Sequence, residues 1–129
     1  MYRIRQIVNC TSRMVIYLVT CFKCIIQGVG STDVFYTRMG NYKTNIMKKK
    51  GSCGIEHHFK KPGHSYEDFN VQIIAQLENV PMNRKEAFQR LRSFEGYWQV
   101  ELCTLEPNGM NTIDEFHRNR YAQDKPSFM

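Results

Sequence analysis

The apolar run at residues 14–26 constrains the fold of this chain more than any other feature of the sequence. Residues 14–20 are rich in β-branched and aromatic side chains, and this short stretch predicts a buried strand. Lys23 then interrupts the run, which is shorter than the roughly 20 apolar residues of a membrane-spanning helix. No small-residue cleavage site follows, so a secretory signal is not expected. We therefore predict an intracellular protein that does not associate with a membrane.

The apolar pattern predicts a hairpin followed by a helix. A second strand is expected at residues 25–29, which places the segment from Cys21 to Cys24 in the turn. Residues 31–33 (Ser-Thr-Asp) are typical of a helix N-cap. The helix itself is predicted by apolar side chains at steps of three and four, and it ends in three lysines and a glycine at residues 48–51. Its apolar residues are Phe35, Met39, Tyr42 and Ile46.

The second half of the chain adds one strand and one long helix. Residues 54–61 predict one or two helical turns, and residues 70–77 predict a third strand. A long helix is expected at residues 83–102, with its apolar face formed by Ala87, Leu91, Phe94, Trp98 and Leu102. The predicted fold is α/β (α+β), a small three-stranded mixed or antiparallel sheet flanked by helices. It spans residues 1–112, and residues 113–129 form a polar basic tail.

Charge and cysteine content narrow the classes of function. The chain of 129 residues fits one domain, which could belong to a longer polyprotein. Eighteen Lys and Arg residues against twelve Asp and Glu residues give a net charge of +6, which is typical of proteins that bind nucleic acid or an anionic surface. The five cysteines are an odd number, which fits a secreted disulfide framework poorly and favours reduced thiols that can bind metal.

Motifs spread along the chain resemble those of a nuclease family. They occur in the family's order between about residues 3 and 112, and they are Val15-Ile16-Tyr17, Cys21-x-x-Cys24, Gly28-Val29-Gly30-Ser31-Thr32, Arg38-Met39-x-Asn41-Tyr42-Lys43, His58-Phe59, Gly63-His64-Ser65, Glu95-x-Tyr97-Trp98 and Leu102-x-Thr104-Leu105-x-Pro107-x-Gly109-Met110-Asn111. The sequence resembles the GIY-YIG endonuclease domain, in particular the type found in Penelope-like and related eukaryotic retroelements. The resemblance implies a small sheet flanked by helices that cuts DNA phosphodiesters with one divalent metal ion, Mg²⁺ or Mn²⁺.

The resemblance also implies a role for each matching residue. Tyr17 would help to activate the attacking water, Arg38 would hold the scissile phosphate, Glu95 would bind the metal ion, and Asn111 would orient the site. Without the resemblance, Tyr17 could be a packed strand residue, Arg38 an exposed helix residue and Asn111 a turn residue. Glu95 is different, because it lies near the apolar side of its helix, where an unpaired charge is costly.

Two positions depart from the family pattern. The family has a tyrosine where this chain has Gly28, and commonly a histidine where this chain has Tyr42. Tyr42 lies four residues after Arg38 and therefore shares its helix face, so we include Tyr42 among the catalytic candidates. A phenol is a poor base at pH 7, and a positioned acid or base contributes about 10²–10⁴ in rate. We therefore predict that the chain keeps the family's fold, and that it cleaves DNA more slowly than a domain with the full family pattern.

The retroelement resemblance further implies a structural zinc site. Its ligands would be Cys21, Cys24, His58 and His64, with Cys53 or His57 as a possible replacement for one of them. The long separation between the Cys pair and the His pair means that tertiary folding must bring them together. The alternative is two buried thiols and two surface histidines.

The expected partner is double-stranded DNA. In a retroelement the domain would nick target DNA to expose a 3′ end for priming, with a reverse transcriptase N-terminal to it, and it would work in the nucleus. A different class of function is a zinc-stabilised DNA-binding module that has lost catalysis, as Gly28 and Tyr42 would allow. A purely structural interaction domain is the third reading.

Overall fold

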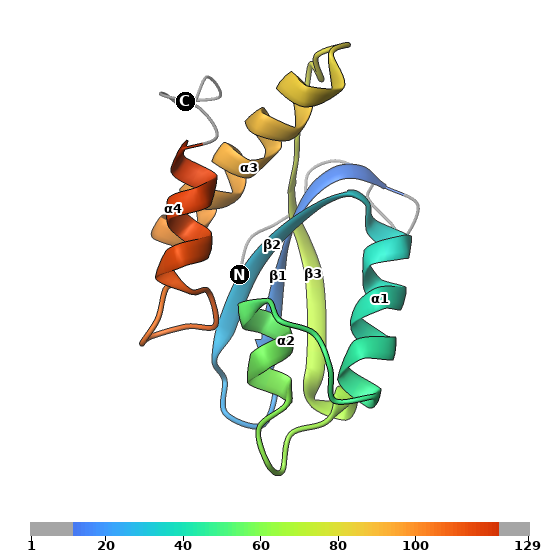
Figure 1. The fold of residues 1–129 in the computed structure, drawn as a ribbon, viewed down its shortest axis with the longest axis vertical. Coiled ribbons are helices and arrows are strands. Elements are labelled where there is room, and N and C mark those ends of the chain that lie inside the picture. Colours follow the sequence, from blue (N-terminus) through green and yellow to red (C-terminus); the bar gives the residue numbers. More distant parts are fainter. Residues whose placement is uncertain (1–11, 122–129) are drawn as a thin grey trace.

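The computed structural model describes residues 12–121, and they form a three-stranded antiparallel sheet with helices around it (Figure 1). The strands are β1 (Arg13–Cys21), β2 (Gln27–Val34) and β3 (Phe69–Gln76), in the order β2-β1-β3. Both neighbours of β1 are antiparallel to it. The predicted fold class is confirmed, and of the two sheet types expected, the antiparallel one is found.

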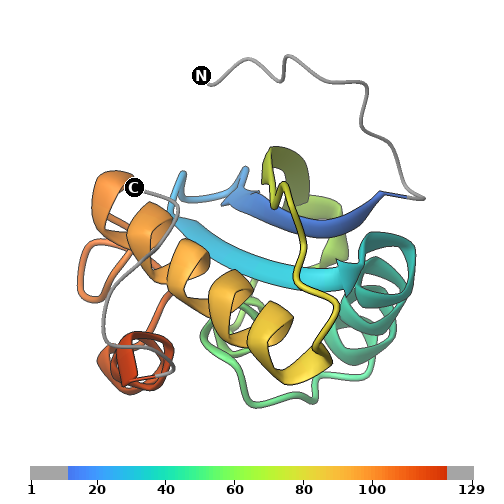
Figure 2. The same cartoon turned by 90° about the horizontal axis from the view of Figure 1, so that it is seen from above.

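The central strand explains the two-sided core. Side chains alternate between the two faces of a strand, and in β1 both sets are apolar. Val15, Tyr17 and Val19 pack with the first helix, α1 (Phe35–Met47), and with α2 (Gly54–Phe59). The intervening side chains pack against the long helix α3 (Arg84–Glu101). In both views α1 lies toward one side of the sheet, and α3 lies toward the other (Figure 1, Figure 2).

The prediction of a helix N-cap at residues 31–33 is wrong. These residues continue β2, which is longer than expected because it pairs with β1 as far as Val34, opposite Arg13. Arg13 and Asp33 also form an ion pair across the two strands at 2.9 Å. Val34 is the N-cap of α1, and no side chain caps it. Strand pairing therefore overrides the local capping preference, and it places Ser31 on a strand facing α3.

The connections after α1 are short and locally capped. Cys53 caps α2 by accepting a hydrogen bond from the Glu56 backbone, and the Glu56 side chain accepts one from the Cys53 N–H. The 3₁₀ turn η1 (Tyr66–Asp68) then leads into β3. The turn between β1 and β2 contains Cys24, as the sequence predicts.

Two helices complete the fold. Asn83 caps α3 by accepting a hydrogen bond from the Glu86 N–H at 3.1 Å, and the predicted apolar face of α3 packs on the sheet. Helix α4 (Ile113–Tyr121) lies alongside α3, in the part of the chain for which the sequence predicts a polar basic tail (Figure 1). None of the helices between residues 12 and 121 is long and apolar enough to cross a membrane.

Gly30 makes a close approach that a larger residue would block. A Cβ atom at Gly30 would overlap the ring and hydroxyl of Tyr17, on the neighbouring strand. We expect Gly30→Ala to lower the free energy of unfolding by about 1–3 kcal/mol, the usual cost of overpacking a core. Gly40→Ala is the control, because its Cβ would meet nothing within 4 Å and alanine favours a helix. Urea unfolding of both variants measures the difference, and equal stabilities would contradict this packing.

Candidate active site and metal centre

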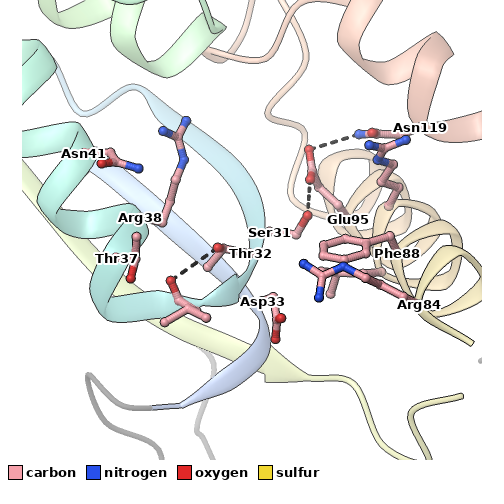
Figure 3. A pocket seen from close by; sticks show the side chains of 13 residues that line it. Ser31, Thr32, Asp33, Thr37, Arg38, Asn41, Arg84, Phe88, Glu95 and Asn119 are labelled. Carbon is pink, nitrogen blue, oxygen red and sulfur yellow. Dashed lines mark hydrogen bonds between the residues drawn. The ribbon is translucent and has the colours of Figure 1, made fainter. Parts of the chain in front are cut away.

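A pocket of about 470 Å³ lies between β2, α1 and α3 (Figure 3). Arg38 and Asn41 line it from α1, whereas Glu95 lines it from α3 and Asn119 from α4. Two of the predicted catalytic residues, Arg38 and Glu95, therefore share one cavity. Its remaining lining residues are Ser31, Thr32, Asp33, Val34, Thr37, Arg84, Phe88, Leu91 and Arg92.

Glu95 is a partly buried carboxylate held by neutral donors. The Ser31 hydroxyl donates to its Oε1 at 2.5 Å. The side-chain amides of Gln99 and Asn119 donate to its Oε2 at 2.9 and 3.0 Å. Burial raises the pKa of Glu95 to about 7, although the hydrogen bonds from Ser31 and Asn119 act in the opposite direction. A carboxylate in this state is stabilised by a cation, and it fits the metal-binding role that the sequence predicts.

Arg38 is fixed on three sides. Its guanidinium lies 3.9 Å from the centre of the Tyr42 ring, in a cation–π contact. Its nitrogens are 3.7 Å from a carboxylate oxygen of Glu56 and 3.6 Å from the Cys53 sulfur. Glu56 is itself almost fully buried and accepts a hydrogen bond from Asn45 at 2.6 Å. These contacts hold a planar, charged group on the wall of the pocket, where it suits a phosphate.

Tyr17 and Tyr42 form a buried hydroxyl pair. Their oxygens are 2.7 Å apart, and each side chain is only 1% exposed. Burial raises the pKa of both phenols, so both stay protonated at neutral pH. The charge of Arg38 acts in the opposite direction on both pKa values. At this position, where the sequence resemblance implies a histidine, the chain has a tyrosine that stacks on Arg38 and bonds to Tyr17.

The structure gives a physical reason for the departure at Gly28. A Cβ atom there would lie 2.9 Å from the side chains of both Ile55 and Met110. A tyrosine at this position would need the space that those two residues fill.

Asn111 is buried away from the pocket, against the backbone of β2. It donates to the Val29 carbonyl at 2.9 Å and accepts from the Val29 N–H at 2.8 Å and from the Thr104 hydroxyl at 2.6 Å. Asn111 is therefore a buried residue that bonds to two other segments, and it does more than complete a turn. Asn111 thereby links the segment after α3 to Val29 of β2.

The four predicted zinc ligands come together. The ligand atoms of Cys21, Cys24, His58 and His64 all lie within 4.8 Å of one another. A tetrahedral zinc ion with these ligands needs separations of about 3.3–3.8 Å, which small side-chain adjustments would reach. Burial, together with the charges of Lys61 and His64, lowers the pKa of His58 to about 4, so that its ring is neutral at pH 7. Metal ligation requires this neutral form.

Two further observations fit zinc at this cluster. The Nε2 atom of His64 is buried and has no hydrogen-bond partner among residues 12–121, while its Nδ1 lies 3.3 Å from the Pro62 carbonyl. The Cys24 sulfur is 3.3 Å from the His58 Nε2. The two alternative ligands lie elsewhere, because Cys53 caps α2 and His57 is exposed. The donor set of two thiols and two imidazoles is the one that structural zinc prefers.

Several residues of the site were not predicted from the sequence. The sequence pattern places Ser31 in a helix cap, and it does not single out Gln99, Asn119 or Glu56. Gln99 could have been found, because it lies four residues after Glu95 on the same helix face. Asn119 and Glu56 reach the site through tertiary packing and carry no local signal.

This arrangement has the same fold as a solved endonuclease catalytic domain. Among solved structures, the chain is similar to the catalytic domain of the homing endonuclease I-TevI, with 23% identity, a TM-score of 0.54, and coverage of 79% of this chain and 100% of the other. It is also similar to a glutamate-to-alanine mutant of the catalytic domain of the intron endonuclease I-TevI, with 23% identity, a TM-score of 0.52, and coverage of 77% and 92%. No protein-family model and no curated protein matches the sequence.

The raised pKa of Glu95 predicts a pH-dependent stability. The folded pKa of about 7 lies above the ordinary value of 4.5, so protonated Glu95 stabilises the fold fully below pH 4.5. This contribution, about 3 kcal/mol at most, is lost as the pH rises through 7. Glutamine does not ionise, so the Glu95→Gln variant should not lose this stability as the pH rises. At pH 8 without Mg²⁺ or Mn²⁺, the variant should therefore have a higher free energy of unfolding than the unchanged protein.

Urea unfolding at pH 5 and pH 8 measures this effect, with the exposed Glu101→Gln on the same helix as the control. The control should keep the pH dependence of the unchanged protein. The same slope in Glu95→Gln would show that this carboxyl is not the group responsible.

Proposed function

We propose that this domain is a DNA endonuclease that hydrolyses phosphodiester bonds with one divalent ion, Mg²⁺ or Mn²⁺, held by Glu95. The observation that carries the proposal is the shared pocket, in which Arg38 on α1 and Glu95 on α3 meet within a GIY-YIG fold. The similarity to a homing endonuclease catalytic domain supports DNA as the substrate. The net charge of +6 is consistent with a polyanionic partner.

Arg38 is the proposed phosphate-binding group. Its planar fork can donate two parallel hydrogen bonds to a phosphate and offset the charge that develops during cleavage. The Tyr42 ring and the Glu56 carboxylate limit the orientations of the guanidinium. Arg38 therefore enters the reaction in a fixed position and needs little reorganisation.

The oxygen donors beside the pocket fit a hard divalent cation. Glu95 supplies a carboxylate and Ser31 a hydroxyl, and such oxygen ligands suit Mg²⁺ and Mn²⁺. When bound, the ion would polarise the phosphoryl group and stabilise negative charge on its oxygens. Gln99 and Asn119 hold the carboxylate in place for that purpose.

Tyr17 is proposed to act on the attacking water, the role that the family resemblance implies. Its hydroxyl is protonated at neutral pH and bonded to Tyr42, while Arg38 supplies the nearby positive charge that favours the phenolate. In this proposal the Tyr17 hydroxyl donates its proton to the Tyr42 oxygen as a hydrogen bond, which leaves the Tyr17 oxygen free to accept a hydrogen bond from the attacking water. Asn111 contributes by fixing β2, which carries Ser31 into the site.

A plasmid-nicking assay tests the proposal. Supercoiled DNA is incubated with the protein and Mg²⁺ or Mn²⁺, alongside Glu95→Ala and the control Glu101→Ala, whose carboxylate is exposed on the same helix. We expect metal-dependent nicking that is lost in Glu95→Ala and kept in the control. Nicking that survives in Glu95→Ala would remove Glu95 from the proposal, and no nicking with either ion would reject the enzyme.

The second candidate function is a zinc-stabilised DNA-binding module without catalysis. It is favoured by Gly28 and Tyr42, and by the burial that keeps Tyr17 protonated. This module would shift DNA in a gel, would lose affinity as salt increases, and would not cut DNA at any metal concentration.

We further propose the cellular setting on the strength of the sequence resemblance alone. The domain would belong to a longer retroelement polyprotein with a reverse transcriptase N-terminal to it. It would nick double-stranded target DNA in the nucleus to expose a 3′ end for priming. The Penelope-like subtype is part of this proposal.

A further inference from the structure

We propose that Asn119 on α4 is a specificity-determining residue, which favours Mg²⁺ over Ca²⁺ at Glu95 by occupying one oxygen of that carboxylate. The inference rests on the proposed function and concerns a helix for which the sequence predicts only a polar tail. Figure 3 shows the Asn119 side chain directed at the carboxylate of Glu95, to which a dashed line joins it.

The two oxygens of Glu95 are used unequally. A carboxylate offers about four acceptor positions, two on each oxygen. Oε2 accepts two hydrogen bonds, from Gln99 at 2.9 Å and Asn119 at 3.0 Å. Oε1 accepts one, from Ser31 at 2.5 Å. The hydrogen bonds therefore leave one acceptor position for a cation, and it lies on Oε1.

Helix α4 is held so that Asn119 stays in this position. The Asn119 side chain is 8% exposed and packs over Gly96 on α3, where a Cβ atom would lie 3.6 Å from the Asn119 Cβ. At the start of α4, Thr112 and Glu115 exchange hydrogen bonds, and the second oxygen of Glu115 accepts one from the Gly54 N–H at 3.3 Å. Both ends of the described helix are thus tied to the body of the fold.

A carboxylate with a single open acceptor position, on Oε1 of Glu95, is expected to bind Mg²⁺ better than Ca²⁺. Mg²⁺ is small, keeps most of its water and usually takes single oxygens from one or two carboxylates. Ca²⁺ accepts more ligands and often takes both oxygens of one carboxylate. With Oε2 occupied by two amides, Glu95 can offer a single oxygen, which suits Mg²⁺. Removing the Asn119 amide would free a position on Oε2 and relax this preference.

Calorimetric titration of the zinc-loaded protein with Mg²⁺ and with Ca²⁺ tests the inference without an activity measurement. We expect Asn119→Ala to weaken Mg²⁺ binding about tenfold, as is usual when a residue that orients a metal ligand is lost. Ca²⁺ binding should weaken less or improve, so the ratio of the two Kd values shifts toward Ca²⁺. Asn119→Ser, which keeps a polar but shorter side chain, should shift the ratio in the same direction, and it provides a milder change if Asn119→Ala folds poorly.

Two controls separate this inference from the proposed function. Arg118→Ala, an exposed neighbour on α4, should leave both affinities unchanged, and Glu95→Ala should abolish the binding. If the unchanged protein shows no Mg²⁺ binding that depends on Glu95, the proposed function and this inference both fail. If that binding is present but neither Asn119 variant changes the Mg²⁺/Ca²⁺ ratio by more than about twofold, against the expected tenfold effect, only this inference fails.

Discussion

Arg38→Ala is expected to reduce the rate of DNA cleavage by about 10³-fold or more, the usual loss when an arginine that stabilises a phosphoryl transition state is removed. The Arg38 guanidinium is held on the pocket wall by Tyr42 and Glu56, on the side opposite Glu95 (Figure 3). Because the rest of the basic surface remains, DNA binding should weaken far less than the rate of cleavage. Single-turnover nicking and a gel-shift titration measure the two effects separately.

Arg38→Lys sharpens this experiment. Lysine keeps the charge but loses the planar fork and much of the stacking on Tyr42, so we expect little rescue of the rate. Lys43→Ala is the matched control, because it removes an exposed positive charge from the same helix outside the pocket. Equal cleavage by Arg38→Ala and Lys43→Ala would mean that Arg38 contributes only to the general charge of the surface.

Loss of zinc should produce the largest change in stability. A structural zinc site contributes directly to folding, by about 10 kcal/mol or more in isolated zinc-finger peptides. Loss of even about 3 kcal/mol would lower the Tm of a domain of this size by roughly 10 °C. Cys24→Ser and treatment of the unchanged protein with a chelator should lower the Tm to similar values, and the variant should no longer respond to the chelator.

Cys103→Ser is the control for the zinc experiment, since Cys103 is an exposed thiol outside the cluster. It should keep both the Tm and the response to chelator. A chelator that leaves the Tm of the unchanged protein in place would contradict a structural metal at these four residues. Metal analysis of the purified protein then identifies the ion that is bound.

Much of the fold was predictable because its signals are local. The run of β-branched and aromatic residues in β1 and the spacing of apolar residues in α1 and α3 each lie within one element. The end of β2 was not predictable in this way. Ser31 and its two neighbours have the composition of a helix cap, and only their pairing with β1 across the hairpin makes them a strand.

Residues of the candidate site that belong to sequence motifs could be predicted. Residues that reach the site only through tertiary packing could not. Arg38 and Glu95 were expected to act together, and they line one pocket. The pairing of Cys24 with His58 spans 34 residues, so its geometry could come only from the fold. Asn119 was missed because a polar helix has a weak pattern, and its contact with Glu95 depends on how α4 packs on α3.

Helix α2 has a practical consequence for anyone who purifies this protein. Within six residues it carries Glu56 beside Arg38 and His58 of the Cys/His cluster for which zinc is proposed, and its cap is Cys53. If a chelator is used during purification and then replaced by excess Mg²⁺, Glu95 would have Mg²⁺ available but the Cys/His cluster would lack its zinc. Helix α2 would then be held less firmly, and its Glu56 would position Arg38 less well. Such a sample would give a low specific activity that no further Mg²⁺ corrects, while added Zn²⁺ would restore it. Zinc content therefore has to be measured before any preparation is judged inactive.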